Sequence, residues 1–99
     1  MKLKMQSIHF DADRKLLAFI GEKVNKLTRF FDDIIDGEVI LKLDKNQNSA
    51  NKVIQIRVNI PGNELIVKEQ RRTFEEATDI AVQALTIQIK KHKEKIKRI

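Results

Sequence analysis

One segment of this chain, residues 52–60, constrains the fold more than any other, because apolar and polar side chains alternate along it. In an extended strand every second side chain points to the same side, so isoleucine and valine gather on one face and Arg57 lies on the other. A strand with one apolar face belongs to a sheet that is covered on that side and open to water on the other. We therefore expect a one-sided sheet in which Ile56 and Val58 are buried.

Three other segments carry the signals of strands. Residues 38–44 alternate in the same way, and residues 2–9 alternate apolar side chains with lysines. Residues 64–70 follow the tight-turn sequence Pro61-Gly62-Asn63, which predicts a return of the chain beside the alternating segment. Together these segments make four predicted strands.

Two segments have the period of a helix instead. The first follows Asp11 and Asp13, which are both favourable N-caps, and continues to Phe31 with apolar residues spaced three or four apart. This stripe consists of Leu16, Ile20, Val24, Leu27 and Phe31. Phe30 is expected to widen the stripe, and Ile34 and Ile35 are expected to plug the core after it. The second helix spans residues 73–98, begins with a capping-box sequence, and has an apolar stripe only in the half that docks on the sheet.

The element order is therefore β-α-β-β-β-α, which predicts an α+β fold. The first helix is a crossover connection, so the first two strands are expected to be parallel, while strands two to four form an antiparallel meander. Each helix has one apolar stripe, so both helices are expected to pack on one face of a four-stranded mixed sheet. A chain of 99 residues buries one core, and we expect a single domain over residues 1–99.

The positive charge of the chain is concentrated at its C-terminal end. The last ten residues hold six Lys or Arg and one Glu, a net charge of +5, whereas the whole chain carries +6. The dipole at a helix end favours one or two cations, which does not account for six. A second basic group, Lys23, Lys26 and Arg29, lies on one flank of the first helix. We interpret the two groups as one surface that binds a polyanion, most simply a nucleic acid.

The sequence offers no chemistry for catalysis. The chain contains no cysteine, its three glycines stand far apart, and neither His9 nor His92 has metal-ligand spacing. We therefore expect no enzyme activity, no cofactor, no metal and no small-molecule substrate. No apolar segment is long enough to span a membrane, no signal peptide is visible, and the last helix has no aromatic residue beyond Phe74 to hold a membrane surface. We expect a cytoplasmic protein with no membrane partner.

The distribution of aromatic residues narrows the mode of nucleic-acid binding. All five phenylalanines lie in or beside the helices, so base stacking on the strands, as in RNA-recognition motifs, is not expected. Lysine outnumbers arginine in both basic groups, which favours phosphate contacts over base reading. We expect a surface without base-stacking aromatics that recognises structured RNA by shape and charge. The alternative is a double-stranded-RNA-binding domain, although that fold begins with a helix and carries its lysines at the start of its second helix.

Several stretches of the sequence carry a resemblance to a known family. They are KVNKLTRFFDDIIDGEVILKLDKN, NIPGNELIV, and TFEEATDIAVQAL followed by KKHKEKIK. In this order and at these spacings they resemble the ribosome hibernation-promoting factor family, which includes the ribosome-associated inhibitor called protein Y. The resemblance implies a β-α-β-β-β-α domain that binds the small ribosomal subunit in the channel between head and body. There the family blocks messenger RNA and A- and P-site transfer RNA, and so inhibits translation in stationary phase or under stress.

The resemblance also implies candidate binding residues. Basic positions on the first helix of the family match Lys23, Lys26 and Arg29, and its Lys-His-Lys run matches Lys91, His92 and Lys93. With the rest of the C-terminal run, the candidate ribosome-binding residues are Lys23, Lys26, Arg29, Lys90, Lys91, His92, Lys93, Lys95, Lys97 and Arg98. Leu17 and residues 84–89 depart from positions where many relatives carry cations. The chain resembles a short form without the ribosome-dimerising second domain, and we expect a monomer away from the ribosome.

Overall fold

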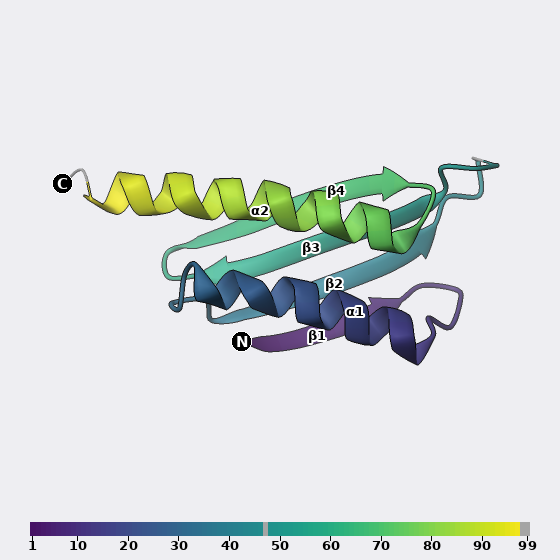
Figure 1. Cartoon of the computed structure of the whole chain (residues 1–99), viewed down its shortest axis with the longest axis horizontal. Coiled ribbons are helices and arrows are strands. Elements are labelled where there is room, and N and C mark those ends of the chain that lie inside the picture. Colours follow the sequence, from purple (N-terminus) through teal and green to yellow (C-terminus); the bar gives the residue numbers. More distant parts are fainter. Residues whose placement is uncertain (47, 98–99) are drawn as a thin grey trace.

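The alternating segment forms β3, Lys52–Ile60, which lies inside a four-stranded sheet. The structure is a computed structural model that describes residues 1–46 and 48–97. The other strands are β1, Lys2–Ser7; β2, Asp36–Leu43; and β4, Asn63–Arg71. The strands follow one another in chain order across the sheet, so β1 and β4 form its edges (Figure 1).

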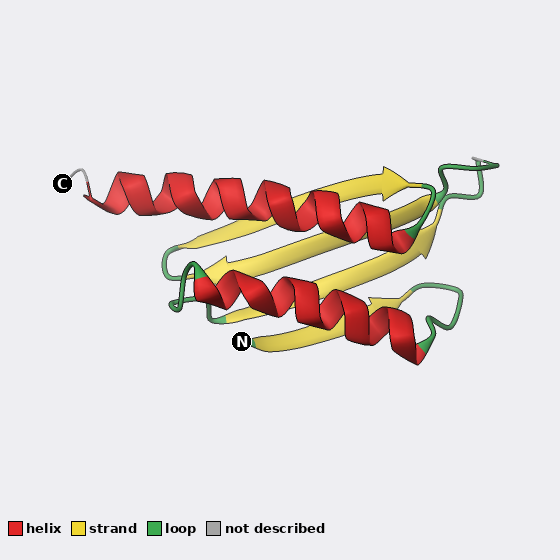
Figure 2. Ribbon diagram, viewed as in Figure 1, coloured by secondary structure: helices red, strands yellow, loops and turns green. Residues whose placement is uncertain are grey.

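The sheet is mixed, as the element order predicted. β1 pairs with β2 in parallel, and β2, β3 and β4 pair in antiparallel fashion. The helices α1, Arg14–Asn25, and α2, Phe74–Lys97, both lie on one face of this sheet (Figure 2). The predicted α+β fold with element order β-α-β-β-β-α is therefore confirmed.

The core lies between the sheet and the two helices. Ile56 and Val58 on β3 are completely buried, which confirms the predicted apolar face of that strand. Val24 on α1 and Leu85 on α2 belong to the same buried cluster. Burying one aliphatic side chain of this size stabilises a fold by about 1.5–3 kcal/mol. Arg57 points to the opposite face, which the described elements leave open to solvent.

The hairpin between β3 and β4 follows from its turn sequence. Pro61 supplies a fixed φ, and Gly62 has a φ of 76°, a backbone conformation that favours glycine. Ile60 pairs with Asn63 across the turn, so the chain reverses within two residues. This tight connection sets the register that keeps the apolar positions of both strands on the same face.

The first helix differs from the prediction at its C-terminal end. α1 stops at Asn25 and the chain continues as a 3-10 turn, η1, Lys26–Arg29, whereas the sequence predicted one helix as far as Phe31. The Thr28 hydroxyl donates to the Asn25 carbonyl oxygen at 2.7 Å. Local bonds of this kind compete with the regular α-helical ladder, which accounts for the tighter turn.

Two side chains that were expected in the core are exposed instead. Phe30 is 44% exposed and Ile35 is 59% exposed, whereas Phe31 and Ile34 are buried. Neighbouring side chains in a helical turn point about 100° apart, so Phe30 turns outward once Phe31 occupies the core. Consecutive side chains in extended backbone point to opposite sides, and Ile35 therefore points away from the core that Ile34 enters.

Candidate nucleic-acid interface

The two helices point their C-terminal ends toward the same end of the sheet, and α2 projects beyond the strands (Figure 1). Its 24 residues span ~36 Å at the usual helical rise. The predicted cations gather there, so we call this region the basic end. Its described side chains are Lys26, Arg29, Lys90, Lys91, His92, Lys93 and Lys95, whereas Lys23 lies farther back, beside Asp79 in the second turn of α2. For Lys97 only the helical backbone is described, and Arg98 lies outside the described residues.

Two aromatic rings after η1 hold lysines of α2 against the first helical segment. The Lys90 ammonium lies 6.0 Å from the centroid of the Phe30 ring, and the Lys93 ammonium lies 5.6 Å from that of Phe31. Cation–π contacts at exposed sites are worth about 0.5–1 kcal/mol, and they also orient the long lysine side chains. The structure therefore joins the end of η1 to the end of α2 and brings Lys90 and Lys93 beside the η1 segment.

His92 packs against the body of the protein. Its ring meets the Phe31 ring edge to face, with 5.8 Å between the centroids, and the side chain is half-buried. Because Phe31 is itself buried, the two rings close the end of the core between the helices. The packing of His92 fixes the direction in which the neighbouring lysines leave the helix. A direct contact of His92 with RNA stays a prediction.

Lys91 and Lys95 lie on the other flank of α2. Consecutive helical residues point about 100° apart, so Lys91 faces away from the flank that Lys90 and Lys93 share. Lys95 follows about one turn later on the side of Lys91, and both side chains are exposed. The basic end therefore wraps around the tip of α2 and does not face a single direction.

Lys23 has partners within the protein. Its ammonium lies 3.5 Å from the Asp79 carboxylate of α2 and 5.5 Å from the centroid of the Phe19 ring. This half-exposed ion pair adds about 0–1 kcal/mol to stability, but it partly neutralises the lysine. Of the ion pairs found between described side chains, this is the one that involves a candidate binding residue. Lys26 and Arg29 are therefore the stronger candidates for phosphate contacts on the first helical segment.

Phe30 corrects one expectation about this surface. The sequence predicted no aromatic residue for base stacking, yet nearly half of Phe30 is exposed beside Lys90. The helical stripe contains the signal that would have revealed this, since Phe31 takes the core position four residues after Leu27. The basic end thus combines cations with one accessible aromatic ring.

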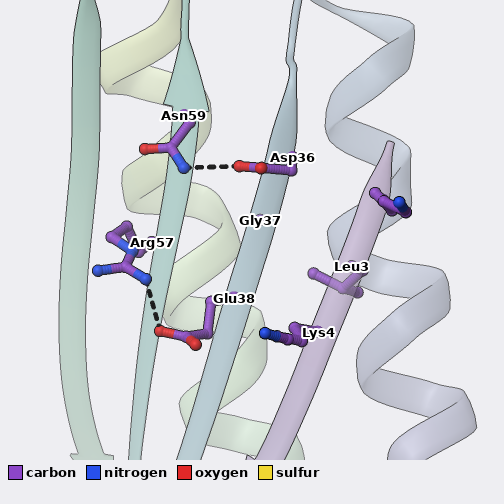
Figure 3. A pocket seen from close by; sticks show the side chains of 8 residues that line it. Leu3, Lys4, Asp36, Gly37, Glu38, Arg57 and Asn59 are labelled. Atoms are coloured by element: carbon purple, nitrogen blue, oxygen red, sulfur yellow. Dashed lines mark hydrogen bonds and ion pairs between the residues drawn. The ribbon is translucent and has the colours of Figure 1, made fainter.

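The open face of the sheet has a different character. It contains a pocket of about 480 Å³ (Figure 3), lined by Lys2, Leu3, Lys4, Asp36, Gly37, Glu38, Arg57 and Asn59. The Arg57 guanidinium donates to the Glu38 carboxylate at 2.7 Å, and the Asn59 amide donates to Asp36 at 2.6 Å. Acidic and basic groups alternate across neighbouring strands, so this face has no field of a single sign. A polyanion is therefore expected to bind at the basic end and not in this pocket.

The described residues contain no group of three or more His, Cys, Asp or Glu side chains that could hold a metal ion. Within residues 1–46 and 48–97, no helix combines the length and the apolar character needed to cross a membrane. The chemistry that the basic end offers is ionic contact and hydrogen bonding from lysine and arginine, together with the face of one ring.

Comparisons with known proteins identify what the chain is similar to. The family described as Sigma 54 modulation protein / S30EA ribosomal protein matches residues 3–97. A ribosome hibernation promoting factor from Pseudomonas putida is 30% identical over 95 residues, which cover 96% of this chain and 89% of that protein.

Two solved structures share the fold. A ribosomal subunit interface protein from Coxiella burnetii has a TM-score of 0.83 at 19% identity, covering 95% of this chain and 99% of that one. The N-terminal domain of protein Y from Thermus thermophilus has a TM-score of 0.80 at 24% identity, covering 93% of this chain and 99% of that one. At these identities the likeness concerns the arrangement of strands and helices.

Proposed function

Because the chain belongs to the Sigma 54 modulation protein / S30EA ribosomal protein family, we propose that it acts as a ribosome hibernation factor on the small ribosomal subunit. In this proposal the basic end binds phosphates of the small-subunit ribosomal RNA in the channel between head and body. The bound protein blocks messenger RNA and the A- and P-site transfer RNAs. Translation is thereby inhibited in stationary phase or under stress.

The basic end is the observation that carries this proposal. Lysine and arginine side chains from η1 and α2 meet at one end of the molecule, where cation–π contacts orient Lys90 and Lys93. Phosphate contacts supply most of the affinity of proteins that bind nucleic acid without reading its sequence. Lysine binds phosphate as a point charge, which suits recognition of RNA by shape and charge.

The proposed inhibition is by occupancy. The molecule measures 48 × 23 × 18 Å along its principal axes, with the tip of α2 at one end of the long axis. A body of this kind fills a channel and prevents other molecules from entering, without turnover of a substrate. The proposal therefore includes no enzyme activity. It also treats residues 1–99 as one domain that is monomeric away from the ribosome and works in the cytoplasm.

Charge reversal at the basic end tests the proposal. Lys26→Glu with Lys90→Glu is expected to abolish co-sedimentation with purified small ribosomal subunits, because both side chains are solvent-accessible cations of that surface. The matched control is Lys42→Glu with Lys68→Glu, which makes the same charge change at exposed positions on the open face of the sheet. Circular dichroism checks that both variants fold. Equal loss of binding in the control, or full binding by the basic-end variant, would refute the proposed interface.

The sequence left one alternative function, that of a double-stranded-RNA-binding domain, and no observation in the structure supports it. β1 precedes the first helix, and the cations lie at the C-terminal end of α2. Equal affinity for an isolated RNA duplex and for the small subunit would favour this alternative.

A further inference from the structure

Phe30 is held outward by the backbone at the end of η1. Its amide donates to the Leu27 carbonyl oxygen at 3.0 Å, and the Phe31 amide donates to the same oxygen at 3.1 Å. Phe31 fills the core, so this pair of bonds leaves the neighbouring ring 44% exposed to water. The exposure of Phe30 is thus fixed by the turn and by the burial of Phe31.

The exposed ring lies beside one cation and follows two others closely in the chain. The Lys90 ammonium sits 6.0 Å from the ring centroid, and Arg29, the preceding residue, is exposed. Lys26 lies about one turn earlier in the same segment and is half-exposed. Proteins that bind single-stranded nucleic acids combine an aromatic ring with nearby cations. The ring stacks on a base, and the cations neutralise the phosphates of the strand.

Acidic residues limit the direction of approach. Asp32 and Asp33 follow Phe31 in the chain, and both are exposed. They repel phosphate on the side of the loop, whereas Lys90 attracts phosphate on the side of α2. A nucleotide is therefore favoured with its phosphate toward α2 and its base toward the phenyl ring.

We propose that Phe30 is a stacking site for an unpaired RNA base, with Lys90 and Arg29 contacting the flanking phosphates. This inference rests on the proposed binding of RNA by the basic end and names a further feature of its ligand. The RNA at this position is not a continuous duplex, because a paired base has both faces stacked and offers none to the ring. The base itself is not specified, since every base has a stacking face.

Two short RNA hairpins test the proposal. One has a fully paired stem, and the other has the same stem with a single extrahelical adenine. Binding is measured by fluorescence anisotropy for the wild type, Phe30→Leu and Phe30→Tyr. Loss of one base–aromatic stack is expected to weaken binding of the bulged hairpin by about 5- to 160-fold. Phe30→Leu keeps an apolar side chain of similar size but has no aromatic face, whereas Phe30→Tyr retains one.

The wild type is expected to prefer the bulged hairpin, and Phe30→Leu is expected to bind both hairpins alike. Its salt dependence stays that of the wild type, because no charge is removed. The matched control is Ile66→Ala, since Ile66 is 49% exposed on the open face of the sheet, and this variant keeps the preference. Equal binding of both hairpins by the wild type, or a retained preference in Phe30→Leu, overturns base stacking.

Co-sedimentation with small ribosomal subunits separates this inference from the proposed function. A wild type that does not bind subunits overturns both. A wild type that binds subunits, together with a Phe30→Leu variant that binds subunits and hairpins equally well, overturns only the stacking. Weakened subunit binding by Phe30→Leu with unchanged binding of both hairpins would assign the ring to a ribosomal protein, which also overturns base stacking.

Discussion

The proposed small-subunit binding is expected to depend on salt through the number of free cations at the basic end. Each cation that contacts a phosphate releases counterions, so the affinity falls on a log–log plot with a slope of about −0.7 to −0.9 per contact. Six cations of the basic end lie outside the ion pairs found between described side chains: Lys26, Arg29, Lys90, Lys91, Lys93 and Lys95. If all of them contact RNA, a fourfold rise in salt lowers the affinity by about 300- to 2,000-fold.

Single substitutions resolve the contributions to that slope. Lys26→Ala and Lys91→Ala are each expected to flatten it by about one charge. Lys23→Ala is expected to flatten it less, because the Asp79 carboxylate 3.5 Å away already compensates part of the Lys23 charge. The assay is an anisotropy titration of labelled protein with small subunits at several salt concentrations. Lys68→Ala, on the open face, serves as the control. An affinity that does not change with salt, or a control that flattens the slope as much as Lys26→Ala, would refute the electrostatic reasoning.

Two further predictions concern the fold. Ile56→Ala is expected to lower the free energy of unfolding by about 2–5 kcal/mol and Tm by about 10–30 °C, because Ile56 is completely buried. The control Ile66→Ala, on the open face, is expected to change Tm little. An unchanged Tm for Ile56→Ala would contradict the assignment of Ile56 to the buried face. Hydrogen bonds from the Asn46 amide and the Gln70 side chain hold the pKa of Asp44 below its ordinary value. Asp44 therefore stabilises the fold above that ordinary pKa and loses this effect as pH falls through the folded value. Asp44→Asn is expected to flatten the acid limb of a plot of Tm against pH, and an identical limb would contradict this account.

Strand and helix periodicity was sufficient to predict the architecture. The alternation that buries Ile56 and Val58 specifies the face of the sheet, and a one-residue slip would have moved both to solvent. The end of the first helix was harder to predict, because the choice between an α-helix and a 3-10 turn after Asn25 depends on local bonds such as that of Thr28. Ile35 was misplaced because hydrophobicity alone does not say which of two adjacent isoleucines enters the core.

The charges of the candidate site were visible in the sequence, but their pairing was not. Lys23 and Asp79 lie far apart in the chain and meet only when the two helices pack side by side. The packing of His92 against Phe31 likewise depends on where η1 ends relative to α2. Such contacts are tertiary, so charge counting treats Lys23 as equivalent to Arg29 when the structure distinguishes them.

Inhibition by occupancy of the small subunit is the central claim, and a cell-free translation titration tests it most directly. Increasing amounts of wild-type protein are added to a fixed concentration of ribosomes, beside Lys91→Glu with Lys95→Glu and the open-face control Lys42→Glu with Lys68→Glu. Both basic-end lysines are exposed on the projecting part of α2, so their reversal is expected to abolish inhibition without unfolding the domain. The wild type and the open-face control are expected to inhibit translation at about one molecule per ribosome. Excess messenger RNA and initiator transfer RNA are expected to relieve this inhibition. Inhibition at far fewer molecules than ribosomes, or full inhibition by the folded basic-end variant, would contradict the claim.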